Sequence, residues 1–70
     1  MKISARNRLA GTVAAINEGA VNSIVKLDIG GGHTISATIS KEAVKELGLK
    51  EGKKAYAVIK ATSVMMAVDD

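Results

Sequence analysis

The sequence predicts a mainly β protein in which five antiparallel strands form a barrel and one short helix lies between strands three and four. Three observations support this fold class. Apolar residues alternate with polar ones over several stretches, one stretch has helical spacing, and glycine-containing turns separate these segments. Seventy residues without a Pro, linker, repeat or low-complexity segment make a single domain, residues 1–70.

Three strands are predicted in the first 40 residues, over 7–16, 21–30 and 33–40. The turn "NEGA" separates the first two, and glycines at 30–32 can take the positive φ angles of a tight hairpin before the third. Alternation with a period of two places one set of residues on a common face of each strand. These sets are Leu9, Gly11, Val13 and Ala15, then Val21, Ser23, Val25, Leu27 and Ile29, then Ile35, Ala37 and Ile39.

The helix is predicted over "KEAVKELGL". Ser40 precedes it as an N-cap, and Gly48 is placed to end it in the left-handed conformation. Val44 and Leu47 recur at helical spacing, so we expect both to plug one end of the barrel.

Two further strands are predicted after the turn "EGKK". They span residues 55–61 and 63–68, and the second places Met65 and Met66 at a contact between subunits. The resulting order, β-β-β-α-β-β, is that of the OB-fold barrel.

The composition favours association of several copies of the chain. A domain this small buries a limited share of its surface and commonly needs disulfides, a metal or oligomerisation. The absence of Cys and the presence of one His exclude disulfides and a thiolate metal site. Hydrophobic residues are 47% of the chain and Tyr56 is its only aromatic residue, so its apolar surface is aliphatic. We therefore expect a homo-oligomer.

Charge and hydropathy suggest a cytoplasmic protein that meets small anions. The net charge is +3, and the basic residues are scattered rather than clustered. The N-terminal stretch becomes polar after Ile3, which does not match a signal peptide, and no stretch approaches the roughly 20 apolar residues of a membrane span. We expect neither a membrane nor a nucleic-acid partner.

No pattern in the sequence indicates an enzyme. His33 is the only imidazole and follows three glycines, which fits a solvated hairpin better than a catalytic base. Those glycines lack the Lys-Ser/Thr pair and the helix of a phosphate loop. The acidic residues are dispersed over turns, helix and tail, so no cluster predicts a metal directly ligated by the protein.

Two short segments are instead rich in hydrogen-bond donors. "SARN" contains Ser4, Arg6 and Asn7, "KATS" contains Lys60 and two hydroxyl residues, and neither has a carboxylate. A deprotonated tetrahedral oxyanion has only acceptors, so a selective site for it should combine donors with one or two positive charges. The alternative is that these side chains satisfy nearby backbone groups or are simply solvated. Spacing alone does not distinguish the two.

Three motifs extend this interpretation. "ISARN", "ISKEAVKELGLKEG" and "AVIKATSVMMA", in this order, resemble the molbindin (Mop) family, small molybdate-binding relatives of the TOBE domains. The resemblance implies an OB-fold-like subunit and a homohexamer built as a trimer of dimers. It further implies that molybdate or tungstate is bound between subunits, as cargo for storage or homeostasis and without a resident cofactor.

The resemblance also implies a set of site residues. The oxyanion site at the dimer interface would use one segment at the start of the chain, the residue ahead of the helix and the end of strand four. These positions are Ser4, Arg6 (largely through its backbone), Ser40, Lys60 and Ala61. A second site near the threefold axis is expected around "GAVN", with Asn22 as its candidate.

Two other functions stay open at this point. OB-folds often bind single-stranded nucleic acid by stacking bases on aromatic side chains along a basic groove, but this chain offers one Tyr. A ligand-free oligomerisation or regulatory module would form the same assembly without affinity for anions.

Overall fold

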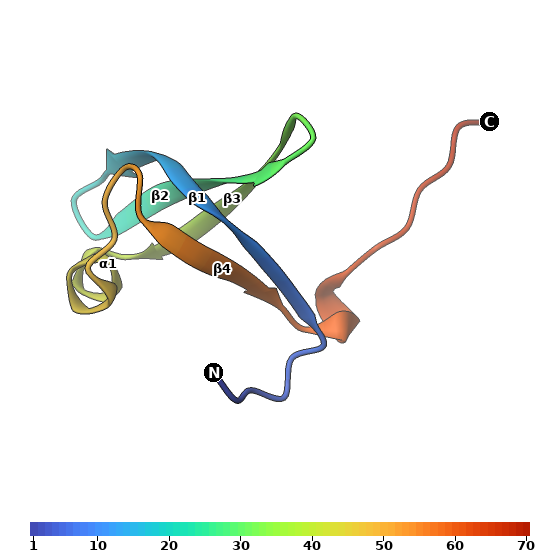
Figure 1. Ribbon diagram of the computed structural model, residues 1–70, viewed down its shortest axis with the longest axis horizontal. Helices are drawn as coiled ribbons and strands as arrows, with labels where there is room; N and C mark the ends of the chain where they lie inside the picture. Colours follow the sequence, from blue (N-terminus) through green and yellow to red (C-terminus); the bar gives the residue numbers. More distant parts are fainter.

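The structure is a computed structural model that describes all residues, 1–70. Four strands, one α-helix and one 3₁₀ turn follow one another along the chain (Figure 1). They are β1 (Asn7–Glu18), β2 (Asn22–Gly30), β3 (His33–Ser40), α1 (Lys41–Leu47), β4 (Lys54–Ile59) and η1 (Ala61–Ser63). The α-helix has seven residues and is therefore much too short to cross a bilayer.

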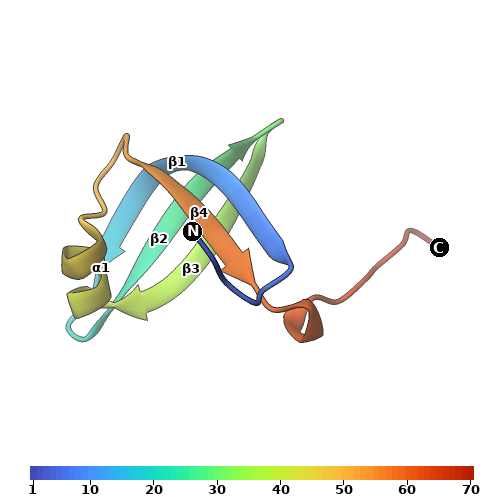
Figure 2. The same ribbon diagram turned by 60° about the horizontal axis from the view of Figure 1, so that its bottom comes forward.

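The four strands form one antiparallel sheet in the order β3-β2-β1-β4, which curls into a half-barrel (Figure 2). The long strand β1 joins its two halves, because residues 7–12 pair with β4 and residues 12–18 pair with β2. An irregularity in the β1–β2 register lies between Val13 and Ala15. At Gly11 the strands approach so closely that a Cβ would overlap the backbone oxygen of Asp28, so this position requires glycine.

The predicted signals at both ends of the helix are confirmed. Ser40 is the N-cap, and its Oγ accepts a hydrogen bond from the backbone N–H of Ala43 at 3.0 Å. Gly48 adopts φ 63° at the C-cap, and the Lys53 Nζ donates to the carbonyl oxygen of Leu47 at 2.6 Å. The helix is therefore closed at both ends by groups that satisfy its free backbone atoms.

The core is small and lies on the concave face of the sheet, under α1. Val13, Val25, Leu27 and Val44 form its buried cluster. The expectation that Leu47 also plugs the barrel is wrong, since Leu47 is 59% exposed. Only 6 of the 70 residues are buried, and many large apolar side chains of one copy are exposed to solvent.

The hairpin between β2 and β3 forms where the glycines predict it. Gly30, Gly31 and Gly32 have φ angles of 90°, 63° and 80°, which residues with a Cβ rarely adopt. The Asp28 carboxylate accepts a hydrogen bond from the N–H of Gly30 at 2.8 Å. His33 is exposed at the start of β3, as expected of a hairpin residue.

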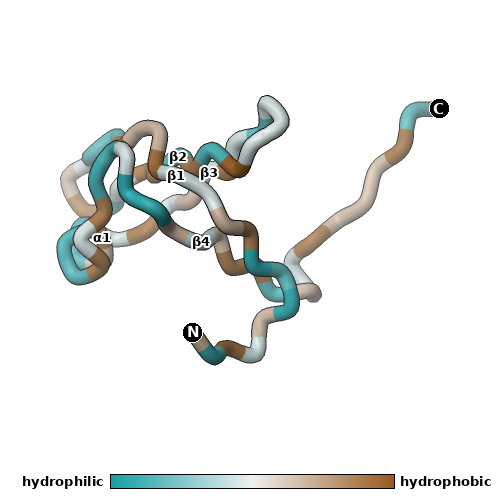
Figure 3. The backbone as a smooth tube through the Cα atoms, viewed as in Figure 1, coloured by the Kyte–Doolittle hydropathy of each residue, from teal (hydrophilic) through white to brown (hydrophobic).

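The predicted fifth strand, residues 63–68, is wrong for the single chain. Strand β4 ends at Ile59 rather than at residue 61, Ala61–Ser63 form the 3₁₀ turn, and residues 64–70 have no regular structure and extend away from the sheet (Figure 1). This C-terminal segment is largely apolar up to its acidic end (Figure 3). Met65, Met66 and Val68 are 90%, 89% and 91% exposed.

The physical reason for the difference is the lack of a pairing partner. A strand is stabilised by hydrogen bonds to a neighbour, and the segment lies against none, although its short apolar run is consistent with a buried strand. The barrel therefore stays open between β3 and β4, which are the two edges of the sheet. The fold is mainly β with one short helix, as predicted, but it has four strands.

Candidate functional site

Strand pairing brings the two donor-rich segments together. Asn7, the first residue of β1, pairs with Ile59, the last residue of β4, and the Asn7 Nδ2 donates to the Ile59 carbonyl oxygen at 3.2 Å. Because the strands are antiparallel, the residues before Asn7 and those after Ile59 emerge at the same end of the sheet (Figure 1). The segments Ser4–Arg6 and Lys60–Ser63 thus leave the sheet at the same end and then diverge (Figure 1).

The donors in these segments are available to a ligand. The side chains of Ser4, Arg6 and Lys60 are exposed, and none of them takes part in the side-chain hydrogen bonds of the chain. Lys60 is the residue before η1, and its side chain makes no capping bond there. Ala61, the first residue of η1, can contribute only its backbone. This end of the sheet therefore offers two positive charges and a hydroxyl without an acidic residue in either segment.

Ser40 combines two roles that a hydroxyl can hold at once. Its Oγ accepts the helix-capping bond from Ala43 through a lone pair, while its own hydrogen remains free to donate. The residue is exposed, so this hydrogen can reach a ligand outside the chain. Capping and anion contact are therefore compatible at Ser40.

In one chain, Ser40 does not lie with the other residues predicted for the dimer-interface site, Ser4, Arg6, Lys60 and Ala61. Ser40 pairs with Asn22 of β2, and the next residue of β2, Ser23, pairs with Glu18, the last residue of β1. Lys60 follows the β4 residue that pairs with Asn7, at the opposite end of β1. A site containing both Ser40 and Lys60 consequently needs a second copy of the chain.

Asn22 is exposed at the first position of β2, directly opposite Ser40. The neighbouring Ser23 Oγ has no hydrogen-bond partner but is only 1% exposed, so it adds no accessible donor. The role of Asn22 in a second site stays a prediction. No group of three or more His, Asp or Glu side chains is arranged to hold a metal ion.

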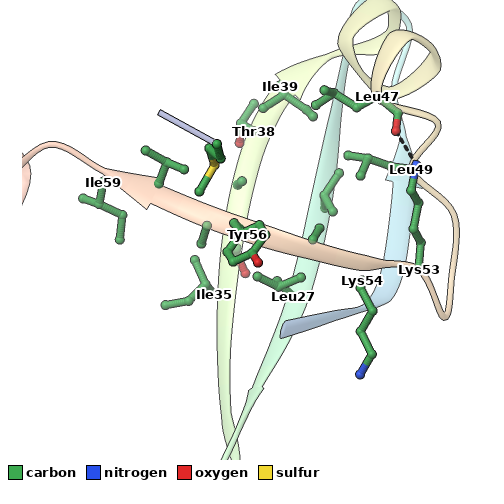
Figure 4. Close-up of a pocket in the computed structure, with 17 residues that line it drawn as sticks. Leu27, Ile35, Thr38, Ile39, Leu47, Leu49, Lys53, Lys54, Tyr56 and Ile59 are labelled. Atoms are coloured by element: carbon green, nitrogen blue, oxygen red, sulfur yellow. Dashed lines mark hydrogen bonds between the residues drawn. The ribbon is translucent and has the colours of Figure 1, made fainter. Parts of the chain in front are cut away.

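An apolar groove that was not predicted from the sequence lies between the two open edges of the sheet (Figure 4). The groove has a volume of about 710 Å³, and 13 of its 17 lining residues are hydrophobic. Its walls include Ile35 and Ile39 from β3 and Ala55, Ala57 and Ile59 from β4. The sequence signal for this wall is the spacing of Ala55, Ala57 and Ile59 at every second position, which puts them on one face of β4, where all three are half-buried.

Known proteins match this chain over nearly its full length. The family model of the TOBE domain matches residues 3–66. A protein of Haemophilus influenzae described as a probable molybdenum-pterin-binding protein is 62% identical over 69 residues, which cover 99% of this chain and 100% of that protein.

Two solved structures have the same fold. A molybdate-binding protein from Sporomusa ovata is 37% identical with a TM-score of 0.90, covering 97% of this chain and all of that one. The cytoplasmic molybdate-binding protein ModG, solved with molybdate bound, is 56% identical with a TM-score of 0.83, covering 87% of this chain and 43% of ModG. The family resemblance stated from the three motifs is thereby confirmed. The chain belongs to the TOBE domain family, among the molybdenum-pterin-binding (Mop) proteins.

Proposed function

We propose that this protein binds molybdate or tungstate between the subunits of a cytoplasmic homo-oligomer and serves storage or homeostasis rather than catalysis. One observation carries the proposal. The predicted donors form two groups at opposite ends of the sheet, with Ser40 in one group and Arg6 and Lys60 in the other, where neither segment has a carboxylate. The molybdate-binding structures of similar chains support the choice of ligand.

The donor set suits a dianion that carries no proton. Molybdate and tungstate present four oxygens that only accept hydrogen bonds, so hydroxyls, N–H groups and cations can surround them completely. Phosphate carries a proton near neutral pH, and this proton would face a set of donors. Sulfate carries none and must be rejected by size, through the spacing of the donors.

We further propose that Ser4, Arg6, Lys60 and Ala61 of one copy meet Ser40 of another around each anion. Arg6 and Lys60 offset the cost of removing the dianion from water. Because the ligand would bind only the assembled form, binding and association would stabilise each other. Asn22 remains the candidate for a second site near the threefold axis of a hexamer built as a trimer of dimers.

The proposed assembly also accounts for the groove and the C-terminal segment. The groove exposes apolar side chains between two unpaired strand edges, and residues 64–68 expose apolar side chains with no strand to pair with. We propose that this segment of one copy enters the groove of another as the missing fifth strand. The apolar side chains of the groove and of the segment would then be buried against each other.

Replacing Lys60 by Ala should weaken molybdate binding by at least about 1.5 kcal/mol, roughly tenfold in Kd, since a charge-assisted contact is lost. Isothermal titration calorimetry measures the affinity, and native mass spectrometry checks that the oligomer is retained. Lys50→Ala, which removes the same charge from an exposed position in the loop before β4, is the control and should leave the affinity unchanged. Equal affinities of the Lys60→Ala variant and the wild type would remove Lys60 from the site.

Ser40→Asp separates capping from anion binding. Asp caps helices as well as Ser does, so the thermal unfolding midpoint should stay near that of the wild type. A carboxylate beside a dianion is repelled, and the affinity for molybdate should fall by more than about tenfold. Ser40→Thr is the matched control and should keep both properties. A Ser40→Asp variant with wild-type affinity would show that Ser40 only caps α1.

Native mass spectrometry of the wild type should detect an even number of chains, six for a trimer of dimers, and molybdate should add several oxyanions to each assembly. The reason is that one chain holds only half of each proposed site and leaves its groove open. Sulfate and phosphate at equal concentration serve as controls and should add fewer ions. A monomer at all concentrations, with or without molybdate, would contradict the proposed assembly.

A further inference from the structure

The C-terminal segment and the free edge of β4 correspond in length and in charge. Strand β4 has six residues and begins with Lys54. The C-terminal segment has five residues from Val64 to Val68, followed by Asp69. If the two run antiparallel with Val64 opposite Ile59, then Val68 lies opposite Ala55 and Asp69 lies directly opposite Lys54.

Side-chain size agrees with this register. Residues directly opposite each other in an antiparallel pair share a face of the sheet. The half-buried β4 residues Ala55, Ala57 and Ile59 would face Val68, Met66 and Val64 across the groove. The two alanines leave the volume that a methionine and a valine need. From Val64 to Val68 the face toward the groove would thus consist of apolar side chains alone, and Asp70, the next residue on that face, would lie past the start of β4, opposite Lys53.

Other alignments bury charge or crowd the oxyanion site. A shift by one residue turns every side chain over, which would point the Asp69 carboxylate into the apolar groove. The opposite chain direction would place Asp69 beside Ile59, at the end of the sheet where Arg6 and Lys60 lie. A carboxylate there would compete with a bound dianion. Only the antiparallel register sets Asp69 against a cation that the proposed site does not use.

Lys54 is free to form this pair. Its side chain is exposed, and its Nζ makes one weak contact, a 3.3 Å hydrogen bond to the Thr12 Oγ1. We propose that Asp69 of one copy forms an ion pair with Lys54 of the copy that accepts its C-terminal segment, and that this pair sets the direction and register of the docked segment. The inference rests on the assembly proposed above and adds the recognition element that aligns it.

The absence of cysteine allows a direct test by disulfide cross-linking. A Lys54→Cys chain is mixed with an Asp69→Cys chain, refolded together and oxidised. A cross-linked dimer of the two different chains should be the main product, because directly opposite residues lie within disulfide distance. Tyr56→Cys mixed with Asp69→Cys, displaced by two positions on the same face, is the control and should cross-link more slowly.

Charge reversal tests the ion pair itself. Lys54→Glu and Asp69→Lys should each weaken association by roughly two- to fivefold per interface in low salt, and mixing the two chains should restore it, since every interface then regains opposite charges. Adding Lys50→Glu to the Asp69→Lys chain itself is the control, because it reverses a charge outside the pair and should restore nothing. If the wild type assembles but the cysteines placed at positions 54 and 56 cross-link equally fast to the one at position 69, this inference is overturned and the assembly stands. The same holds if mixing the charge-reversed chains does not restore association. A monomeric wild type would overturn the assembly as well.

Discussion

Four strands cannot close this sheet into a barrel, and most of the remaining features depend on that constraint. The edges of β3 and β4 stay unpaired, the apolar groove lies between them, and the residues that would fill it extend into solvent. With 6 buried residues, a single copy has a core too small to stabilise the fold strongly by itself. Association with further copies would pair or cover the open edges and would enlarge the buried core.

The same geometry explains why the proposed site is shared. The pairing of Asn7 with Ile59 gathers Ser4, Arg6 and Lys60 at one end of the sheet, whereas β3 carries Ser40 to the other end. Each copy therefore presents two incomplete groups of donors. An anion that bridges such groups would stabilise the assembly that binds it. The contacts that hold the anion would then also hold the copies together.

Local features of the fold were predictable from the sequence because short-range chemistry determines them. Ser40 and Gly48 mark the ends of α1, and Gly30, Gly31 and Gly32 form the hairpin, since each satisfies backbone requirements within a few residues. The fifth strand was predicted wrongly because a strand needs a neighbour, and the apolar run Val64–Val68 does not say which chain supplies it. Likewise, the composition of "SARN" and "KATS" indicated donors, but their proximity depends on the β1–β4 register. The distance of Ser40 from Lys60 and the groove beside Ala57 also follow from tertiary structure alone.

The most direct test of the central claim is anomalous diffraction near the molybdenum absorption edge, from crystals grown with molybdate. We expect an anomalous peak between two copies, within hydrogen-bonding distance of Lys60 and the Arg6 backbone of one copy and the Ser40 hydroxyl of the other. Peaks held within one chain, or interfaces without any peak while Arg6 and Lys60 point into solvent, would contradict the account.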